Sequence, residues 1–256
     1  MTSGTCNSPA LFLYTLRLAD NALILGHRLS EWIGHAPLLE EELALGNVAL
    51  DLIGQARALY AYAGAIEGKG RNEDALAYLR DAPEFRNILL VEQPKGDFAH
   101  TIVRQLLYSA FMHPCWRALA HSRDATLSAI AAKAEKEAAY HLRHASEWLI
   151  RLGDGTAESH RRAQAALDDL WPYAGEMVES DASDEALIAQ GIAADPAPLR
   201  AGWQRCVDSV LAEATLTKPA GSWMQSGGRN GRHSEHLGHL LAEMQFLQRA
   251  YPGATW

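Results

Sequence analysis

The sequence contains four long stretches in which apolar residues recur every three or four positions, the spacing that one face of an α-helix presents. No stretch shows the strict alternation of apolar and polar residues that a half-buried β-strand requires. Asp97 and Asp124 stand before two of the stretches and are typical N-cap residues, while Gly153 closes the last one. These features predict an all-α fold in which four antiparallel helices form a bundle, over residues 11–33, 39–66, 97–121 and 124–152.

The rest of the chain continues the helical pattern. Further helices are expected over residues 157–178, 198–216 and 234–250, and Pro114 is expected to kink or end the third main helix. No repeat, low-complexity tract or long linker divides the chain. We therefore expect residues 1–10 to be a flexible N-terminal tail and residues 11–256 to be a single helical domain.

Charge and cysteine content exclude several classes of protein. The 256 residues carry a net charge of −8, which gives no electrostatic reason to bind nucleic acid or an anionic membrane. The three cysteines are widely spaced and form no C-x-x-C pair, which favours reduced thiols over a disulfide framework or a zinc site. The sequence shows neither an export signal nor an apolar stretch long enough to span a bilayer. We expect a cytoplasmic protein.

The second helix is unusually poor in charge. Between Leu43 and Ile66 only Asp51 and Arg57 are ionised, so we expect protein to surround this helix on most sides. An isolated carboxylate in such a setting is costly, which makes a structural ion pair or hydrogen bond the preferred interpretation of Asp51. Arg104 is a candidate partner, and a surviving metal ligand is the alternative.

Two helical segments carry half of a metal-binding pair each. In ferritin-like four-helix bundles, a carboxylate and a histidine three residues later point inward from one helix and bind a di-iron centre. Here Asp51 is followed by Gly54, and His141 is preceded by Ala138, so each pair lacks one ligand. We interpret the four positions as vestigial, expect no bound metal and favour a supporting role over catalysis. An alternative is an autonomous di-iron oxygenase or oxidase that uses Asp51, His141, Glu137 and His144.

Two other segments have the composition of ligand sites. An acid, an aromatic ring, a cation and an amide follow one another in residues 84–87, a mixture that suits an adenine nucleotide or phosphate, although a surface turn is the simpler interpretation. Residues 226–232 form a basic, glycine-rich stretch before a helix start, where an anion or a partner protein can dock. These segments keep open a second alternative, a CoA-thioester-binding module.

Six segments in order resemble the C subunits of the phenylacetyl-CoA 1,2-epoxidases, the multicomponent ring-epoxidising oxygenases of aerobic phenylacetate degradation. They are residues 18–23, 32–37, 50–57, 90–94, 140–143 and 236–245. The resemblance extends from Leu11 to Trp256. It implies a ferritin-like four-helix bundle with additional C-terminal helices, which acts as a non-catalytic structural subunit.

The resemblance also implies partners. The complex is an NADPH-dependent monooxygenase in which the catalytic A subunit holds the di-iron centre, and a reductase component carries flavin and iron–sulfur groups. This chain would bind no cofactor, would assemble with the A subunit and other subunits, and would self-associate when alone. Phenylacetyl-CoA is expected at the interface, with contacts from Glu84, Phe85, Arg86, Asn87, Glu185, Ala186 and Leu187.

Overall fold

The computed structural model describes residues 8–221 and 223–254, and within these residues the chain forms helices and no β-strand. The expected all-α fold is therefore confirmed for the described part of the chain. The α-helices are α1 (Pro9–Ser30), α2 (Leu39–Glu67), α3 (Glu73–Tyr78), α4 (Leu89–Glu92), α5 (Phe98–Leu119), α6 (Ala125–Gly153), α7 (Ala157–Leu170), α8 (Ala182–Ala189), α9 (Pro196–Glu213), α10 (Glu235–Met244) and α11 (Phe246–Ala250). Short 3₁₀ turns are η1 (Ala82–Glu84), η2 (Trp171–Tyr173), η3 (Gly175–Val178) and η4 (Gly228–Asn230).

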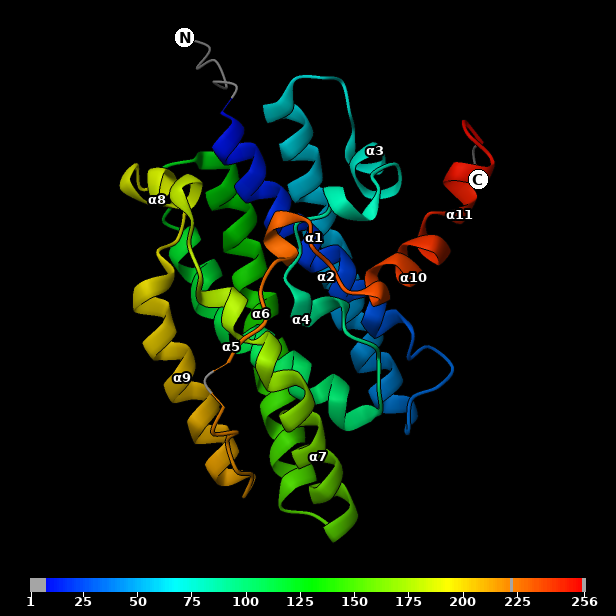
Figure 1. The fold of residues 1–256 in the computed structure, drawn as a ribbon, viewed down its shortest axis with the longest axis vertical. Helices are drawn as coiled ribbons and strands as arrows, with labels where there is room; N and C mark the ends of the chain where they lie inside the picture. The colour runs from blue at the N-terminus through cyan, green and yellow to red at the C-terminus, as the bar shows by residue number, and fades with distance from the viewer. Residues whose placement is uncertain (1–7, 222, 255–256) are drawn as a thin grey trace.

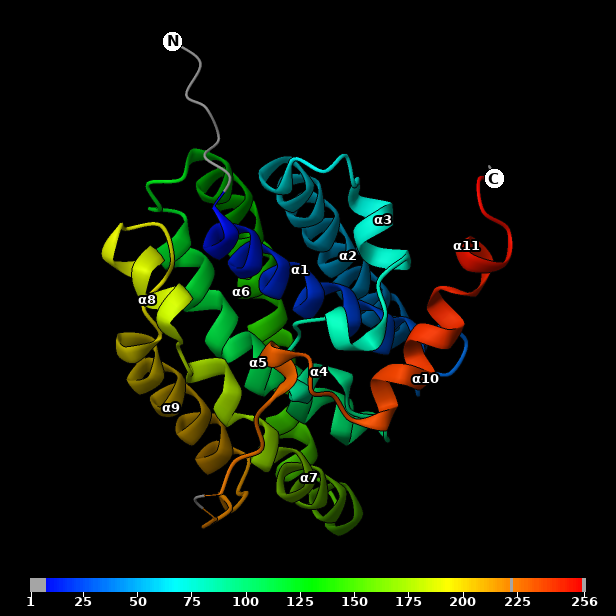
Figure 2. The same cartoon turned by 45° about the horizontal axis from the view of Figure 1, so that its top comes forward.

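The four long helices form the bundle. Helix α1 packs along α2 and α5 packs along α6, while α2 and α6 join the two pairs (Figure 1). Helices α7 and α9 pack on α5 and α6, and α8 packs on α1. Figures 1 and 2 show α8 and α9 on one flank of the bundle and α3, α10 and α11 on the other. The bundle thus carries its additional helices mostly in the C-terminal half of the chain.

Local signals account for several helix ends. The Asp97 carboxylate accepts a hydrogen bond from the backbone N–H of His100 at 3.0 Å, and Asp124 accepts one from Leu127 at 2.8 Å. Gly68 ends α2 in the left-handed conformation, with φ of 67°. The two aspartates therefore cap their helices as the sequence predicts.

Some helix boundaries differ from expectation. Helix α5 continues through Pro114 to Leu119, because the buried side chains of Cys115, Trp116 and Leu119 pack against neighbouring helices and offset the one lost backbone hydrogen bond. The helix expected over residues 157–178 ends at Leu170 and gives way to the 3₁₀ turns η2 and η3. Short helices α3, α4 and α8 lack a long periodic pattern and were not expected.

One hydrophobic core runs through the described residues, from Leu11 on α1 to Leu241 on α10. The expected N-terminal tail lies mostly in residues 1–7, outside the described residues, whereas Pro9 and Ala10 already belong to α1. Across the described ranges, none of the helices combines the length and the hydropathy that crossing a bilayer requires.

Candidate functional site

The contact between α2 and α6 brings Asp51 and His141 together. His141 is buried, and its Nε2 atom lies 3.0 Å from Oδ2 of Asp51, which remains about one-third exposed at 36%. Burial lowers the pKa of His141, and the opposing effect of Asp51 does not restore it. The imidazole is therefore neutral at pH 7 and donates a hydrogen bond to the carboxylate.

Two more polar pairs join the same helices. Nε2 of His144 lies 2.9 Å from Oε2 of Glu41, and Nε2 of Gln55 donates to Glu137 at 2.9 Å. Each donor thus meets one acceptor from the opposite helix. Within residues 8–221 and 223–254, no three His, Cys, Asp or Glu side chains converge on a point that a metal ion could occupy. The residues present do not fit a di-iron centre, which needs several carboxylates and histidines around one position.

The four positions interpreted as vestigial do not share one interior face. Ala138 and His141 are buried, as expected for an inward side of α6. Gly54 is exposed, and a Cβ added to it would meet no atom within 4 Å. The expectation that Asp51 and Gly54 point inward together is therefore wrong for Gly54, because that side of α2 faces away from the bundle.

The expected pair between Asp51 and Arg104 is also wrong. Arg104 is completely buried on α5, and its Nη1 donates to the carbonyl oxygens of Gln93 at 2.8 Å and Pro94 at 2.9 Å. Burial, together with the nearby cation Arg28, lowers the pKa of Arg104 to about 9. Arg104 thus anchors the chain segment that follows α4, and Asp51 takes His141 instead.

Helix α2 leaves one apolar side uncovered. Leu39, Leu43 and Leu50 are 69%, 61% and 67% exposed, and Ile53 and Gly54 continue the same side. We call these five residues the exposed α2 face; their spacing returns to one side of the helix at each turn. We expected protein on most sides of α2; the described residues of this chain leave the exposed α2 face uncovered. The low charge of α2 reflects this exposed apolar face, whereas from the sequence we interpreted the low charge as a sign of burial.

The segment 84–87 serves mainly the core. The Phe85 ring is fully buried with the guanidinium carbon of Arg80 4.2 Å from its centroid, and Asn87 is buried and donates to Glu92 at 2.8 Å. Both side chains lie in the core, and the expected contacts of Phe85 and Asn87 with CoA stay predictions. Glu84 is exposed and Arg86 half-buried, and these two stay accessible.

The second segment expected to contact CoA lies on α8. Glu185 and Ala186 are exposed, whereas Leu187 belongs to the core. No hydrogen bond or ion pair among the described residues joins this segment directly to residues 84–87. The expected CoA contacts of Glu185, Ala186 and the buried Leu187 stay predictions.

The glycine-rich stretch 226–232 binds a carboxylate of the same chain. The buried Glu176 carboxylate accepts hydrogen bonds from the backbone N–H groups of Gly227 at 3.0 Å, Arg229 at 2.9 Å and Leu89 at 2.9 Å. A Cβ on Gly231 would lie 2.2 Å from the carbonyl oxygen of Pro83. This stretch is therefore a structural clamp, and its backbone donors are not free for an external phosphate.

Comparison with known proteins gives two findings. The family model for phenylacetic acid catabolic proteins matches residues 2–256. The C subunit of the 1,2-phenylacetyl-CoA epoxidase from Escherichia coli (strain K12) is 51% identical over 246 residues, which cover 96% of this chain and 99% of that protein. The similarity thus extends over the bundle, the exposed α2 face and the C-terminal helices alike.

Proposed function

Since the chain belongs to the family of phenylacetic acid catabolic proteins, we propose that it is the non-catalytic structural subunit of a phenylacetyl-CoA 1,2-epoxidase. In this role it supports the catalytic A subunit, which holds the di-iron centre of a cytoplasmic complex. Electrons reach that centre from NADPH through the flavin and iron–sulfur groups of a reductase component.

The exposed α2 face is the observation that carries the proposal. Apolar side chains that protrude together from a helix are typical of a protein–protein interface, and obligate interfaces commonly bury more than about 2,000 Å² in total. Ile33 and Leu38, just before α2, are 55% and 54% exposed and enlarge the apolar surface. Arg57, a cation further along α2, is paired with Glu73 at 3.4 Å. Such a surface favours a permanent partner with an apolar contact surface, and we propose that this partner is the A subunit.

The hydrogen bonds between α2 and α6 are consistent with a supporting role. Asp51, Glu41 and Glu137 each bond to a partner from the opposite helix, and these contacts hold α2 in place relative to α6. The polar groups that a catalytic bundle would direct at iron here fix the helix that carries the exposed α2 face. Glu84, Arg86, Glu185 and Ala186 are accessible and are the residues we propose for contact with the CoA moiety.

The experiment is co-purification of the chain with the A subunit, followed by iron counting and phenylacetyl-CoA turnover with and without the chain. We expect iron to follow the A subunit and turnover to require both chains. Leu50→Glu should abolish co-purification, because it puts a charge into an apolar interface. The control is Trp223→Glu, a change at a residue of similar exposure, 68%, outside α2, which should leave the complex intact.

Two results would contradict the proposal. Stoichiometric iron with oxygen-dependent turnover by the chain alone would favour the autonomous di-iron oxygenase. Tight binding of the CoA thioester by the chain without any partner would favour the CoA-binding module.

Without its partner, the wild-type chain should self-associate through the exposed α2 face, and Leu50→Glu should make it monomeric in sedimentation experiments.

A further inference from the structure

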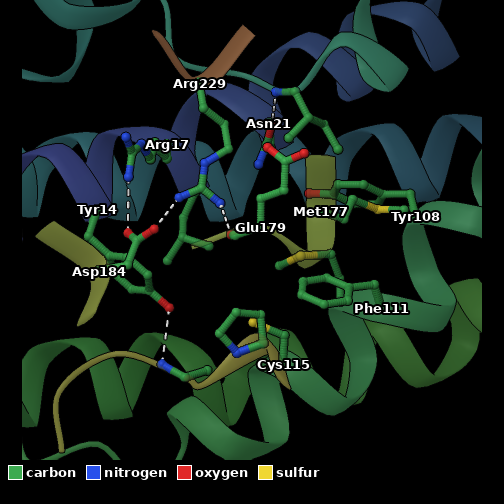
Figure 3. Close-up of a pocket in the computed structure, with 15 residues that line it drawn as sticks. Tyr14, Arg17, Asn21, Tyr108, Phe111, Cys115, Met177, Glu179, Asp184 and Arg229 are labelled. Carbon is green, nitrogen blue, oxygen red and sulfur yellow. Dashed lines mark hydrogen bonds and ion pairs between the residues drawn. The ribbon is translucent and has the colours of Figure 1, made fainter. Parts of the chain in front are cut away.

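A cavity of about 70 Å³ lies between α1, α5 and the segments that cover them from the C-terminal half of the chain (Figure 3). It is separate from the contact between α2 and α6, and nothing in the proposed scaffold role uses it. Aromatic rings and thioethers make up much of its wall, namely those of Tyr14, Tyr108, Phe111, Met112 and Met177. Aromatic walls with a few polar groups are typical of small-molecule sites.

The hydroxyl of Tyr108 in this wall lacks a hydrogen-bond partner. Tyr108 is 3% exposed, and its hydroxyl makes no hydrogen bond with any described residue. Burial raises the pKa of Tyr108 above its ordinary value, so the hydroxyl keeps its proton and offers a donor. In Figure 3 the side chain extends from α5 into the cavity. A buried hydroxyl without a partner is costly, which favours an occupant that carries an oxygen.

A second polar residue lines the same cavity. Glu179 lies at its exposed edge, and partial burial, with a contribution from nearby Glu176, raises the pKa of Glu179. Its carboxylate can accept a hydrogen bond from an occupant. A hydroxyl group on the occupant would therefore donate to Glu179 and accept from Tyr108, which a carbonyl group alone cannot do.

The charges around the cavity disfavour an anionic occupant. Arg17 donates to Asp181 at 2.5 Å and to Asp184 at 3.0 Å, and Arg229 also pairs with Asp184. The two guanidinium groups are thus balanced by two carboxylates, and Glu179 adds negative charge when ionised. Among the described residues that line the cavity, a free carboxylate would find no unpaired cation to neutralise it, whereas a neutral molecule meets no penalty.

We propose that this cavity is a binding site for a small neutral aromatic compound that carries one hydroxyl group, with phenol as the simplest member of the class. Tyr108 and Glu179 bind its hydroxyl, and the rings and thioethers contact its apolar part. The cavity is smaller than the roughly 150 Å³ engineered cavity that holds benzene, so the methionines must move to admit the ring. Methionine side chains are flexible and contact aromatic rings favourably, which suits them to that adjustment.

The test is a titration of the full chain with phenol, followed through the methyl NMR signals of its methionines. We expect the Met112 and Met177 signals to shift together and to saturate, while Met244, which does not line the cavity, stays in place. Benzene should bind about 25-fold more weakly than phenol, because it loses both hydrogen bonds and each is worth about a factor of five. Benzoate should bind less well than phenol, because it is an anion.

The matching variant is Tyr108→Phe, which removes only the unpartnered hydroxyl and should weaken phenol binding about fivefold, the factor for one lost hydrogen bond. Tyr173→Phe, at a half-buried tyrosine that does not line the cavity, should leave phenol binding unchanged. The phenol–benzene comparison on the wild-type chain decides the same question if Tyr108→Phe fails to fold.

Three outcomes would overturn the proposal: no saturable shift of the two methionine signals, which means that ordered water alone fills the cavity; equal binding of phenol and benzene; or benzoate binding as tightly as phenol. Each is measured without the A subunit, so a negative result leaves the scaffold role untouched.

Discussion

Nε2 of His141 on α6 lies 3.0 Å from the carboxylate of Asp51 on α2, and this bond crosses the contact between the two helices. The donor is buried and the acceptor partly exposed, so removing the acceptor leaves a buried N–H without a partner. We predict that Asp51→Ala lowers the free energy of unfolding by about 1 kcal/mol. Urea denaturation measures the change. Asp51→Asn keeps an acceptor oxygen and should cost less; equal losses would contradict the hydrogen bond.

The same histidine should make the protein less stable in acid. Because burial lowers the pKa of His141 in the folded state, the unfolded chain takes up its proton first as the pH falls below about 6.5. The stability it contributes is complete above that pH and is lost as the pH falls through the folded pKa. Urea denaturation between pH 7 and 5 should show a shallower loss for His141→Gln than for wild type.

His233 should act in the opposite direction. Its Nδ1 lies 2.7 Å from the fully buried carboxylate of Glu92; burial opposes protonation, but the hydrogen bond and charge of Glu92 outweigh it and raise the pKa. The stabilisation that protonated His233 provides is complete below about pH 6.5, and it is lost as the pH rises through the pKa of His233 in the folded state. His233→Asn should therefore flatten the decline of stability between pH 6 and 8. An unchanged slope in that range would contradict a charged His233.

Gly54 offers a gain in stability. It lies inside α2 with a helical backbone, and a methyl group there would have free space around it, since no atom lies within 4 Å of an added Cβ. Gly54→Ala should raise the free energy of unfolding by about 0.5–1 kcal/mol, because alanine loses less backbone entropy in a helix. Thermal denaturation of the isolated chain measures it. The comparison is Gly231→Ala, which should destabilise the chain, since Gly231 has φ of 79° and packs against Pro83.

Phe85 should prove to be a core residue. Its ring is fully buried beneath Arg80, so Phe85→Ala should lower the free energy of unfolding by about 3–5 kcal/mol. Glu84→Ala, next to it and exposed, removes only the hydrogen bond that its carboxylate accepts from the backbone N–H of Asp81 at 2.8 Å, and should cost about 1 kcal/mol. Chemical denaturation of both variants separates a structural role of the segment from a role in binding CoA.

The long helices and their caps could be predicted from the sequence because they depend on local chemistry. A helical period of apolar residues, Asp97 and Asp124 at helix starts, and Gly68 or Gly153 at helix ends specify where backbone hydrogen bonds begin and stop. The boundaries failed where packing outweighed a local rule, as at Pro114, or where a short helix such as α8 depends on Arg17 of α1 to hold its N-terminus through Asp181 and Asp184.

The candidate site depends on which side of helix α2 faces the bundle, and the sequence does not specify that side. Helix α2 is apolar around much of its circumference, so its period does not tell which side meets α1 and α6 and which side stays exposed for a partner. The three-residue spacing of Asp51 and Gly54 therefore suggested one inward pair, although Gly54 lies on the exposed side. The sequence by itself determined the four long helices, two of their N-caps and the membership in a family. Only the tertiary structure decided which carboxylate meets which histidine and which apolar surface lacks a cover, because these depend on contacts between residues far apart in the chain.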